Sequence, residues 1–293
     1  MRRTVGEALR TAKERLASAA NPEAEAEELL GRLLDLRRAD LYLERGHTLT
    51  EAEWERLESW LGRRNAGEPI QYITGRAAFR DLDLSVDRSV LIPRPETEGL
   101  VEAVLRVLRA EAPRWTAPRV LDLGTGSGAV ALAIASECPA ARVTATDASV
   151  AALEVARANA AALGLESRVE FLHGNWFAAI GAEDRFEVVL SNPPYVATGE
   201  WKDLPQEVRA FEPHVALFSG PSGLEAQREI VDEAPRHLVA DGLLALELAE
   251  QRAEEVAGWF AGAHEWSEVA LHDDLAGRPR VLLARHRPGP ASD

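Results

Sequence analysis

From about residue 118 onwards, short apolar runs alternate with segments of helical length. This alternation constrains the fold more than any other feature of the chain. Apolar runs of this length predict buried parallel strands, and the alternation predicts an α/β fold whose mostly parallel sheet carries helices on both faces. The predicted strands are Val120–Leu123, Arg142–Thr146, Val169–Leu172, Phe186–Ser191, Leu243–Leu248 and Val281–Ala284, and the predicted helices are Ala129–Glu137, Ala151–Leu163 and Leu224–Leu238.

A polar turn, Asn192-Pro193-Pro194-Tyr195, follows one of these strands. The carboxyl ends of strands are where open α/β sheets bind their ligands. The Asn192 side-chain oxygen can accept one N–H and a backbone carbonyl of the turn can accept another, which suits a planar NH2 group. The prolines fix φ and remove backbone donors, and the Tyr195 ring offers a flat face to an amide or a base. We therefore predict chemistry on nitrogen, with Asn192, Pro193, Pro194 and Tyr195 as catalytic residues.

A glycine-rich loop, Gly124-Thr125-Gly126-Ser127-Gly128, separates the first of these strands from its helix. Glycines permit positive φ and let a ligand approach the backbone. The spacing differs from the Gly-x-Gly-x-x-Gly of dinucleotide sites, and a plain turn would also need glycine. Asp147 favours cofactor binding, because an acidic residue at the end of the second strand can accept both ribose hydroxyls. The alternative is that Asp147 and Ser149 only cap the next helix.

These three features fall at the carboxyl ends of the first, second and fourth predicted strands, on one edge of the sheet. A nucleoside cofactor and an NH2 substrate that meet there suit methyl transfer from S-adenosylmethionine (SAM). An amide lone pair is delocalised into its carbonyl, so two acceptors that hold the N–H bonds would orient it towards the methyl group. They would also stabilise positive charge arriving on nitrogen. No strong general base is needed, since the methylated nitrogen is acidic and loses its proton afterwards.

Residues 1–70 predict a separate helical bundle. Thr4-Val5-Gly6-Glu7 and Thr50-Glu51-Ala52-Glu53 are capping boxes, and Asn21-Pro22 places an N-cap before a proline at the first helical position. Gly67 and Pro69 end the last helix. We expect the apolar stripes of these helices to form a core, and the bundle to dock a partner.

The remaining boundaries follow from changes in pattern. Residues 71–92 predict a β-hairpin linker, with Gln71-Tyr72-Ile73-Thr74 as its first strand. Residues 93–286 form the predicted catalytic domain. The tail 287–293 contains Pro and Gly and is predicted to be disordered.

Charge and cysteine content narrow the function. The net charge is −15, and residues 1–75 carry 12 basic and 14 acidic side chains, so the rest of the chain carries −13. Such acidity argues against a broad nucleic-acid surface. Cys138 is the only cysteine, which excludes an intrachain disulfide and a cysteine-based zinc site, and we expect no metal. The chain shows no apolar signal region and no run long enough to span a membrane. We expect a monomeric cytoplasmic enzyme.

These motifs resemble those of bacterial release factor glutamine methyltransferases of the HemK/PrmC type, over nearly the whole chain. The most specific is Pro93-Arg94-Pro95-Glu96-Thr97-Glu98, because Asn-Pro-Pro-Tyr is shared with amino-directed DNA methyltransferases. The resemblance also covers Gly67–Gly75, Leu121–Gly128, Ser191–Val196, Glu212-Pro213 and Gly223-Leu224.

The resemblance implies a Rossmann-like SAM-dependent methyltransferase domain with a mostly parallel seven-stranded sheet, a helical N-terminal domain and a hairpin linker. It implies methyl transfer to the glutamine of the Gly-Gly-Gln motif in class 1 peptide chain release factors, which supports translation termination and leaves S-adenosyl-L-homocysteine. The residue roles that it implies are Gly124, Thr125, Gly126, Ser127 and Gly128 at the methionine part, Asp147 at the ribose, Trp176 and Asn175 at the adenine, Asn192 and the Pro193 carbonyl at the glutamine amide, Tyr195 packed on that amide, and Arg94 and Thr97 over the cofactor.

The chain departs from the family pattern twice. Asn175 stands where the family usually has Asp, which weakens the expected grip on the adenine amino group. Glu247-Leu248-Ala249-Glu250-Gln251 lacks the usual glycine and brings the Gln one residue closer, which we interpret as a change of scaffold.

Three alternatives stay open. A DNA methyltransferase shares the Asn-Pro-Pro-Tyr logic, but the sequence shows no basic target-recognition domain, and the charge of −13 would repel a duplex. A relative that methylates a ribosomal-protein glutamine would use the same chemistry. A SAM-binding protein without turnover is disfavoured by the intact Asn192 and Tyr195, although Asn175 leaves it possible.

Overall fold

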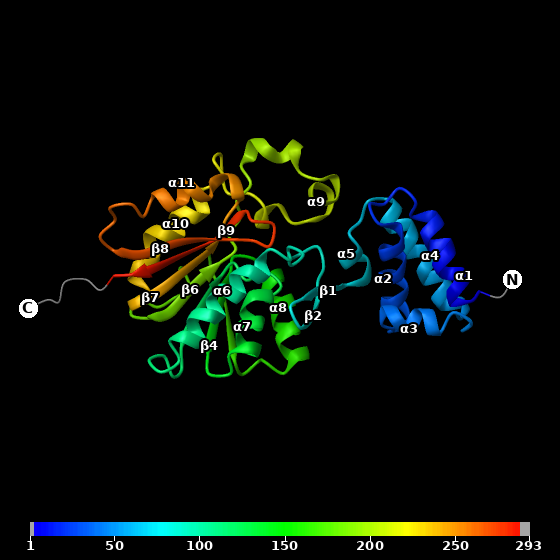
Figure 1. Ribbon diagram of the computed structural model, residues 1–293, viewed down its shortest axis with the longest axis horizontal. Helices are drawn as coiled ribbons and strands as arrows, with labels where there is room; N and C mark the ends of the chain where they lie inside the picture. The colour runs from blue at the N-terminus through cyan, green and yellow to red at the C-terminus, as the bar shows by residue number, and fades with distance from the viewer. Residues whose placement is uncertain (1–2, 288–293) are drawn as a thin grey trace, which may run out of the picture. The chain divides into compact units, whose positions relative to one another are not determined.

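The computed structural model describes residues 3–287, which form two compact units (Figure 1). The first contains the chain up to Arg76 together with Pro205–Phe211, and the second contains Ala77–Leu204 and the chain from Glu212 onwards. From residue 288 onwards, the tail predicted for 287–293 lies outside the described residues.

The first unit is helical, as predicted. Its helices are α1 (Val5–Arg15), α2 (Pro22–Leu34), α3 (Arg38–Leu43), α4 (Glu51–Asn65), α5 (Ile70–Thr74) and α9 (Gln206–Phe211). Both capping boxes form, at Thr4 and Thr50, and Asn21 caps α2. The predicted first residues of α1, α2 and α4 are confirmed. Each helix start depends on hydrogen bonds between residues two or three positions apart, so the local sequence is enough to predict it.

The prediction of a strand over Gln71–Thr74 is wrong, because this segment is the helix α5. A run of four residues fits the period of a strand and that of a helix equally well. Here Ile70 and Ile73, three residues apart, both pack into the core of the bundle, which is the spacing of one helix face. The hairpin follows as β1 (Arg76–Phe79) and β2 (Leu82–Ser85).

The second unit is built on a seven-stranded, mostly parallel sheet, which confirms the predicted fold class. The strand order is β5-β4-β3-β6-β7-β9-β8, and β9 is antiparallel to both of its neighbours, whereas the pairs from β5 to β7 are parallel. The strands are β3 (Arg119–Leu123), β4 (Arg142–Asp147), β5 (Val169–His173), β6 (Phe186–Ser191), β7 (Leu238–Glu247), β8 (Trp266–Asp273) and β9 (Pro279–His286).

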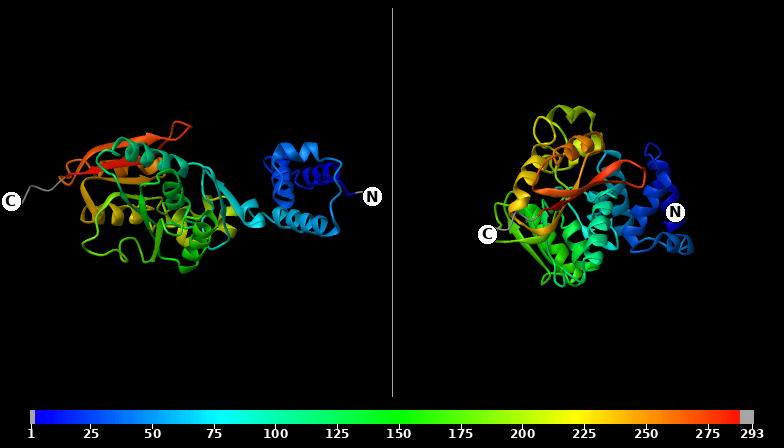
Figure 2. Two further views of the ribbon diagram at one scale, coloured as in Figure 1. Left: turned by 90° about the horizontal axis from the view of Figure 1, so that it is seen from below. Right: turned by 60° about the vertical axis from the view of Figure 1, so that its left-hand side comes forward.

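Two parts of the strand and helix pattern differ from the prediction. The helix predicted for Leu224–Leu238 ends at Glu233, because Pro235 follows in a short 3-10 turn and cannot continue an α-helix. The next strand therefore begins already at Leu238. The strand β8 was not predicted. It lies at the edge of the sheet and is largely exposed, so its sequence lacks an apolar run. Figure 2 shows β8 and β9 as a long hairpin in orange and red.

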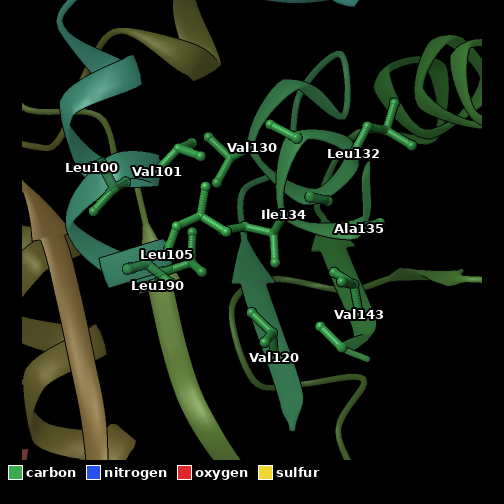
Figure 3. Close-up of a cluster of buried hydrophobic side chains, with 14 of the residues drawn as sticks. Leu100, Val101, Leu105, Val120, Val130, Leu132, Ile134, Ala135, Val143 and Leu190 are labelled. Atoms are coloured by element: carbon green, nitrogen blue, oxygen red, sulfur yellow. The ribbon is translucent and has the colours of Figure 1, made fainter. Parts of the chain in front are cut away.

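Helices cover both faces of the sheet, as Figure 1 shows. Alternate strand residues point to opposite faces, so Val120 packs with α6 and α7, and Leu121 packs with α10 and α11. Figure 3 shows part of the first core, in which helix and strand side chains interlock. The helices and 3-10 turns of this unit are α6 (Thr97–Ala110), α7 (Ala129–Glu137), α8 (Val150–Leu163), α10 (Glu225–Glu233), α11 (Ala253–Gly258), η1 (Thr198–Asp203), η2 (His214–Ala216), η3 (Ala234–Arg236) and η4 (Glu250–Arg252).

The strand order reverses between β3 and β6, which makes this the topological switch point of the sheet. The last residues of the two strands, Leu123 and Ser191, are paired. The buried Ser191 hydroxyl also donates a hydrogen bond to the Leu123 carbonyl at 2.6 Å. The glycine-rich loop and the Asn-Pro-Pro-Tyr turn therefore start side by side.

The core shown in Figure 3 yields a stability prediction. Ile134 on α7 is fully buried, so Ile134→Ala removes apolar contacts and leaves a cavity. We expect urea denaturation to show a loss of about 2–5 kcal/mol in the free energy of unfolding. Leu275 lies fully exposed in the turn between β8 and β9, and Leu275→Ala should change it by less than about 0.5 kcal/mol. Equal effects of the two substitutions would contradict the assigned core.

Candidate active site

The glycine-rich loop uses most of its own backbone N–H groups. Gly124 and Thr125 donate to the Thr146 carbonyl at 2.9 and 3.0 Å, and Gly128 donates to the Thr125 carbonyl at 2.9 Å. Gly126 donates to Asp147 Oδ2 at 2.8 Å. A phosphate group is usually held by free N–H groups at such a loop, so this loop is not arranged as a phosphate cradle.

Gly126 leaves open space in front of the loop. Its φ is +56°, and a Cβ added there would meet no atom within 4 Å. An L-residue would be strained at that φ whatever the space. The loop thus offers a bare backbone that a ligand can approach closely.

Asp122, at the end of β3, supports the loop from below. The carboxylate is fully buried and accepts the Thr125 hydroxyl at 2.6 Å and the backbone N–H of Ala131. Burial raises the pKa of Asp122 to about 7, although these hydrogen bonds oppose the shift. The sequence analysis did not single out this residue.

Asp147 binds both the loop and the start of α8. Its Oδ1 accepts the N–H of Ser149 at 2.8 Å while its Oδ2 accepts that of Gly126, and Ser149 caps α8. The capping arrangement considered from the sequence is therefore present. A carboxylate has about four acceptor positions, so Asp147 can still receive two hydroxyl groups. Burial raises its pKa, and the backbone hydrogen bonds lower it.

Asn192 is held by one side of its amide. Its Nδ2 donates to the Thr97 hydroxyl at 3.0 Å. The other polar atom of the amide, Oδ1, is therefore left to accept a hydrogen bond. Asn192 lines a pocket together with the glycine-rich loop and the Pro-Arg-Pro segment. The lining residues are Phe79, Leu91, Pro93, Arg94, Thr97, Asp122, Gly124, Thr125, Gly126, Ser127, Ala129, Val130 and Asn192.

A buried carboxylate fixes the segment that covers this pocket. Glu212 is 4% exposed and pairs with Arg94 Nη2 at 2.5 Å, while the N–H of Ile92 donates to its other oxygen at 3.4 Å. The ion pair neutralises the Arg94 charge at the pocket wall. Glu212 belongs to a motif that the sequence analysis quoted without a role.

Gly223 and Arg252 hold the far end of the Asn-Pro-Pro-Tyr turn. Gly223 has φ +78°, and a Cβ added there would lie 2.6 Å from the Tyr195 carbonyl oxygen. Arg252 donates to the same carbonyl at 3.4 Å and to Glu200 at 2.7 Å. Only glycine permits so close an approach to the back of the turn.

The other predicted site residues are not among those that line the pocket. Trp176 has φ +44°, and its ring lies close to Gly124, where an added Cβ would be 3.2 Å from Cζ3. Asn175 is exposed and its Nδ2 lies 3.5 Å from Glu229 Oε1. Burial raises the pKa of Tyr195. Asp147 is the last residue of β4, and Asn175, Trp176, Tyr195 and the two prolines follow the carboxyl ends of β5 and β6.

The departure at Ala249 has no conformational cost. The residue has φ −68°, which any L-residue adopts, so glycine is not required there. Gln251 is exposed.

Asn159 is a further residue that the sequence analysis missed. It is 1% exposed, donates to the carbonyls of Ser127 and Ser85 at 2.9 and 3.0 Å, and accepts the Ser85 N–H at 2.7 Å. One buried amide thus joins the glycine-rich loop, α8 and the hairpin. An alanine-rich helix with one Asn gives no sign of these contacts, which reach up to 74 residues along the chain.

The hydrogen-bond acceptors at the glycine-rich loop fit a nucleoside cofactor that carries a positive charge. The groups that contact the loop are the buried carboxyl of Asp122 and the half-buried carboxyl of Asp147. Such groups suit hydroxyl groups and, when ionised, a cation. The loop N–H groups that would hold an anion are largely in use. Within residues 3–287, no three His, Cys, Asp or Glu side chains gather to hold a metal ion. In the same part of the chain, every helix is too short or too polar to cross a membrane.

Asp122 yields a prediction about pH. Its pKa is raised to about 7 in the folded protein from 3.8, so the folded state binds more protons between these values and loses stability as pH rises through them. Asp122→Asn mimics the protonated form. Its stability relative to wild type should therefore increase between pH 5 and pH 8, by roughly 2.5 kcal/mol, measured by chemical denaturation at both values.

The control for this measurement is Asp274→Asn. Hydrogen bonds from Arg278 hold the pKa of Asp274 below its usual value, so this carboxyl is ionised throughout the same range. The stability difference between Asp274→Asn and wild type should not change from pH 5 to pH 8. A flat result for Asp122→Asn as well would contradict the burial of an ionisable carboxyl under the loop.

Comparison with known proteins agrees with this geometry. Family models for the PrmC N-terminal domain and for the methyltransferase small domain match residues 7–75 and 101–208. The release factor glutamine methyltransferase of Cereibacter sphaeroides is 44% identical over 281 residues, which are 95% of this chain and 97% of that protein. The one of Agrobacterium fabrum is 38% identical over 284 residues, 96% and 97% of the two chains.

A solved structure supports the fold alone. A methyltransferase from Pyrococcus furiosus matches with a TM-score of 0.50 and 21% identity, covering 81% of this chain and 99% of that chain. The full-length relatives, which match nearly the whole chain, show that the chain belongs to the release factor glutamine methyltransferase family.

Proposed function

We propose that this chain transfers a methyl group from SAM to the side-chain amide nitrogen of the glutamine in the Gly-Gly-Gln motif of class 1 peptide chain release factors. The products are the methylated release factor, which supports translation termination, and S-adenosyl-L-homocysteine. The observation that carries the proposal is the fixed amide of Asn192, whose Oδ1 is left as an acceptor at the pocket. The names of the full-length relatives supply the substrate class.

The cofactor would lie along the edge formed by β3, β4 and β6. When bound, SAM supplies a methyl group on a positively charged sulfur. The buried Asp122 and the half-buried Asp147 favour positive charge in this region when they are ionised. The proposed contacts are Gly124, Thr125, Gly126, Ser127 and Gly128 with the methionine part, Asp147 with the ribose, Trp176 and Asn175 with the adenine, and Arg94, Thr97 and Asn192 over the methyl end.

The turn would hold the glutamine amide. Asn192 Oδ1 and the Pro193 carbonyl accept its two N–H bonds, and the Tyr195 ring packs on its plane, with Pro194 stiffening the turn. Two acceptors at fixed positions orient the nitrogen lone pair, and such positioning can supply about 7–11 kcal/mol of a barrier. The same acceptors stabilise the positive charge that arrives on nitrogen, and the proton then leaves to solvent.

The helical unit would dock the release factor away from its glutamine. It has its own core and its own family match over residues 7–75, and none of the proposed catalytic or cofactor-binding residues lies in it. On its helix α3, Tyr42 and Leu43 are exposed apolar side chains. We propose that the enzyme acts as a monomer and does not contact nucleic acid directly.

Replacing Asn192 tests the proposal. Asn192→Ala removes one acceptor of the amide, so we expect methylation of a release factor to fall by about 10²–10³-fold, the usual loss for one such hydrogen bond. SAM affinity, measured by calorimetry, should change by less than about threefold. Mass spectrometry of the release factor after incubation with SAM would report the methyl group and its position.

The matched substrate control is a release factor whose motif glutamine is replaced by glutamate, which should gain no methyl group. Unchanged turnover by Asn192→Ala would contradict the role of the amide. A methyl group found only on a ribosomal protein or on DNA would contradict the substrate.

The Asn-Pro-Pro-Tyr turn can be displaced by a substitution at Gly223, a residue that is not proposed to contact the substrate. Gly223→Ala places a Cβ against the Tyr195 carbonyl oxygen, so we expect turnover to fall at least about tenfold, because small displacements of a positioning group cost this much or more. Gly199→Ala, in the η1 turn that follows the motif, meets no atom within 4 Å and should keep wild-type turnover. Equal turnover of the two variants would argue against a rigid turn.

A further inference from the structure

We propose that Thr146 is a positioning residue for the cofactor, because its side-chain hydroxyl holds Trp176 in the conformation that brings the indole ring to the glycine-rich loop. The inference rests on the proposed function, in which Trp176 contacts the adenine of SAM. Thr146 is fully buried and need not touch the cofactor. Its effect would reach the adenine only through Trp176.

Thr146 binds both the glycine-rich loop and Trp176. It is the second-last residue of β4. Its backbone carbonyl accepts the N–H groups of Gly124 and Thr125 at 2.9 and 3.0 Å, and its hydroxyl donates to the Trp176 carbonyl at 2.9 Å. A carbonyl can only accept, so the hydroxyl must be the donor. One buried residue therefore joins the loop, through its main chain, to Trp176, through its side chain.

The backbone of Trp176 has a conformation that few residues other than glycine adopt. Its φ is +44°, in the left-handed region, where the Cβ of an L-residue crowds its own backbone. Such a conformation costs free energy and persists only where the surrounding structure holds it. Without a restraint, Trp176 would relax towards a negative φ, and its ring would leave its present position.

The neighbours of Trp176 are held by other contacts. The Gly174 N–H bonds to the carbonyl of the last residue of β4 at 3.0 Å, and Phe177 is buried in the second core. Within residues 3–287, the Thr146 hydroxyl supplies the one hydrogen bond to the main chain of Trp176 itself. This hydroxyl therefore restrains the rotation of Trp176 between two fixed points.

The place of the indole ring depends on this conformation. A Cβ added at Gly124 would lie 3.2 Å from Trp176 Cζ3, so glycine at this position lets the ring approach the loop closely. Gly124 also lines the pocket that contains Asn192. The indole thus contacts a residue of the pocket wall, where a flat aromatic ring suits a purine.

A purely structural role for the hydroxyl leads to a different expectation. Trp176 also packs against core residues, and if this packing alone fixed the ring, loss of the hydroxyl would lower only the stability of the fold. If the hydroxyl fixes the ring, its loss must move the ring in the free protein and weaken cofactor binding. The methyl-transfer step, which the proposed function places at Asn192, would keep its rate.

Fluorine NMR with fluorotryptophan follows the ring in the free protein. Trp176→Phe assigns the Trp176 signal among the seven tryptophans. Thr146→Val keeps the shape and removes the hydroxyl, so we expect it to shift or broaden the Trp176 signal and to leave the others in place. Thr146→Ser keeps the hydroxyl and should keep the wild-type signal. An unchanged Trp176 signal in Thr146→Val would overturn the proposal, and so would a change in every tryptophan signal, which would show a general structural role.

Cofactor affinity provides the second test, with S-adenosyl-L-homocysteine as the ligand for calorimetry. We expect its Kd to rise about five- to tenfold in Thr146→Val, the size of one hydrogen bond, and to stay within about twofold of wild type in Thr146→Ser. The KM for SAM should rise in parallel, whereas kcat on a release factor at saturating SAM should stay within about threefold of wild type. The matched control is Thr144→Val, two residues earlier on the same face of β4, which should bind the ligand like wild type.

The outcomes separate this proposal from the proposed function. A wild-type protein that binds S-adenosyl-L-homocysteine but does not methylate release factors contradicts the proposed function alone. Equal affinities of Thr146→Val and Thr144→Val would overturn the role of Thr146 whatever the substrate. An equal loss of affinity in Thr146→Ser and Thr146→Val, or a loss of kcat alone, would overturn it as well.

Discussion

The pairing of β3 with β6 is the constraint on which the rest of the site depends. The strand order reverses there, and in open α/β sheets a ligand-binding crevice opens at such a point, outside the carboxyl ends of the strands. The Ser191 hydroxyl joins the ends at the Leu123 carbonyl, which sets the distance between the glycine-rich loop and the Asn-Pro-Pro-Tyr turn. A cofactor on one and an amide on the other can meet only while this pairing holds.

Around that crevice several carboxyl groups are buried, where their ionised form lowers the stability of the fold. Asp122 and Glu247 are both buried at strand ends, and burial raises the pKa of each to about 7. Glu212, by contrast, is buried with Arg94 as its partner. The ion pair of Glu212 fixes the segment that covers the pocket, whereas burial is the largest cause of the raised pKa of Asp122 and of Glu247. Stability is thereby exchanged for a defined electrostatic environment at the site, as is common where a protein binds and reacts.

The motifs and their positions at strand ends could be predicted from the sequence, because both depend on local patterns. The glycine-rich loop, Asp147 and Asn192 indeed lie on one edge of the sheet. The residues that hold them could not be predicted. Glu212 contacts Arg94 across 118 positions, and Asn159 contacts Ser85 across 74, distances at which spacing carries no signal. The sequence analysis did not predict the edge strand β8 or the helix α5 for a different reason. The structure of both segments is decided by tertiary packing and not by the period of their apolar residues.

The central claim is that this edge of the sheet holds a glutamine amide for methylation. A crystal structure of the protein with S-adenosyl-L-homocysteine and a peptide containing Gly-Gly-Gln would test it most directly. We predict that the glutamine side-chain nitrogen lies within about 3.2 Å of both Asn192 Oδ1 and the Pro193 carbonyl oxygen, and faces the cofactor sulfur. A glutamine nitrogen held by other groups, or turned away from the sulfur, would contradict the account.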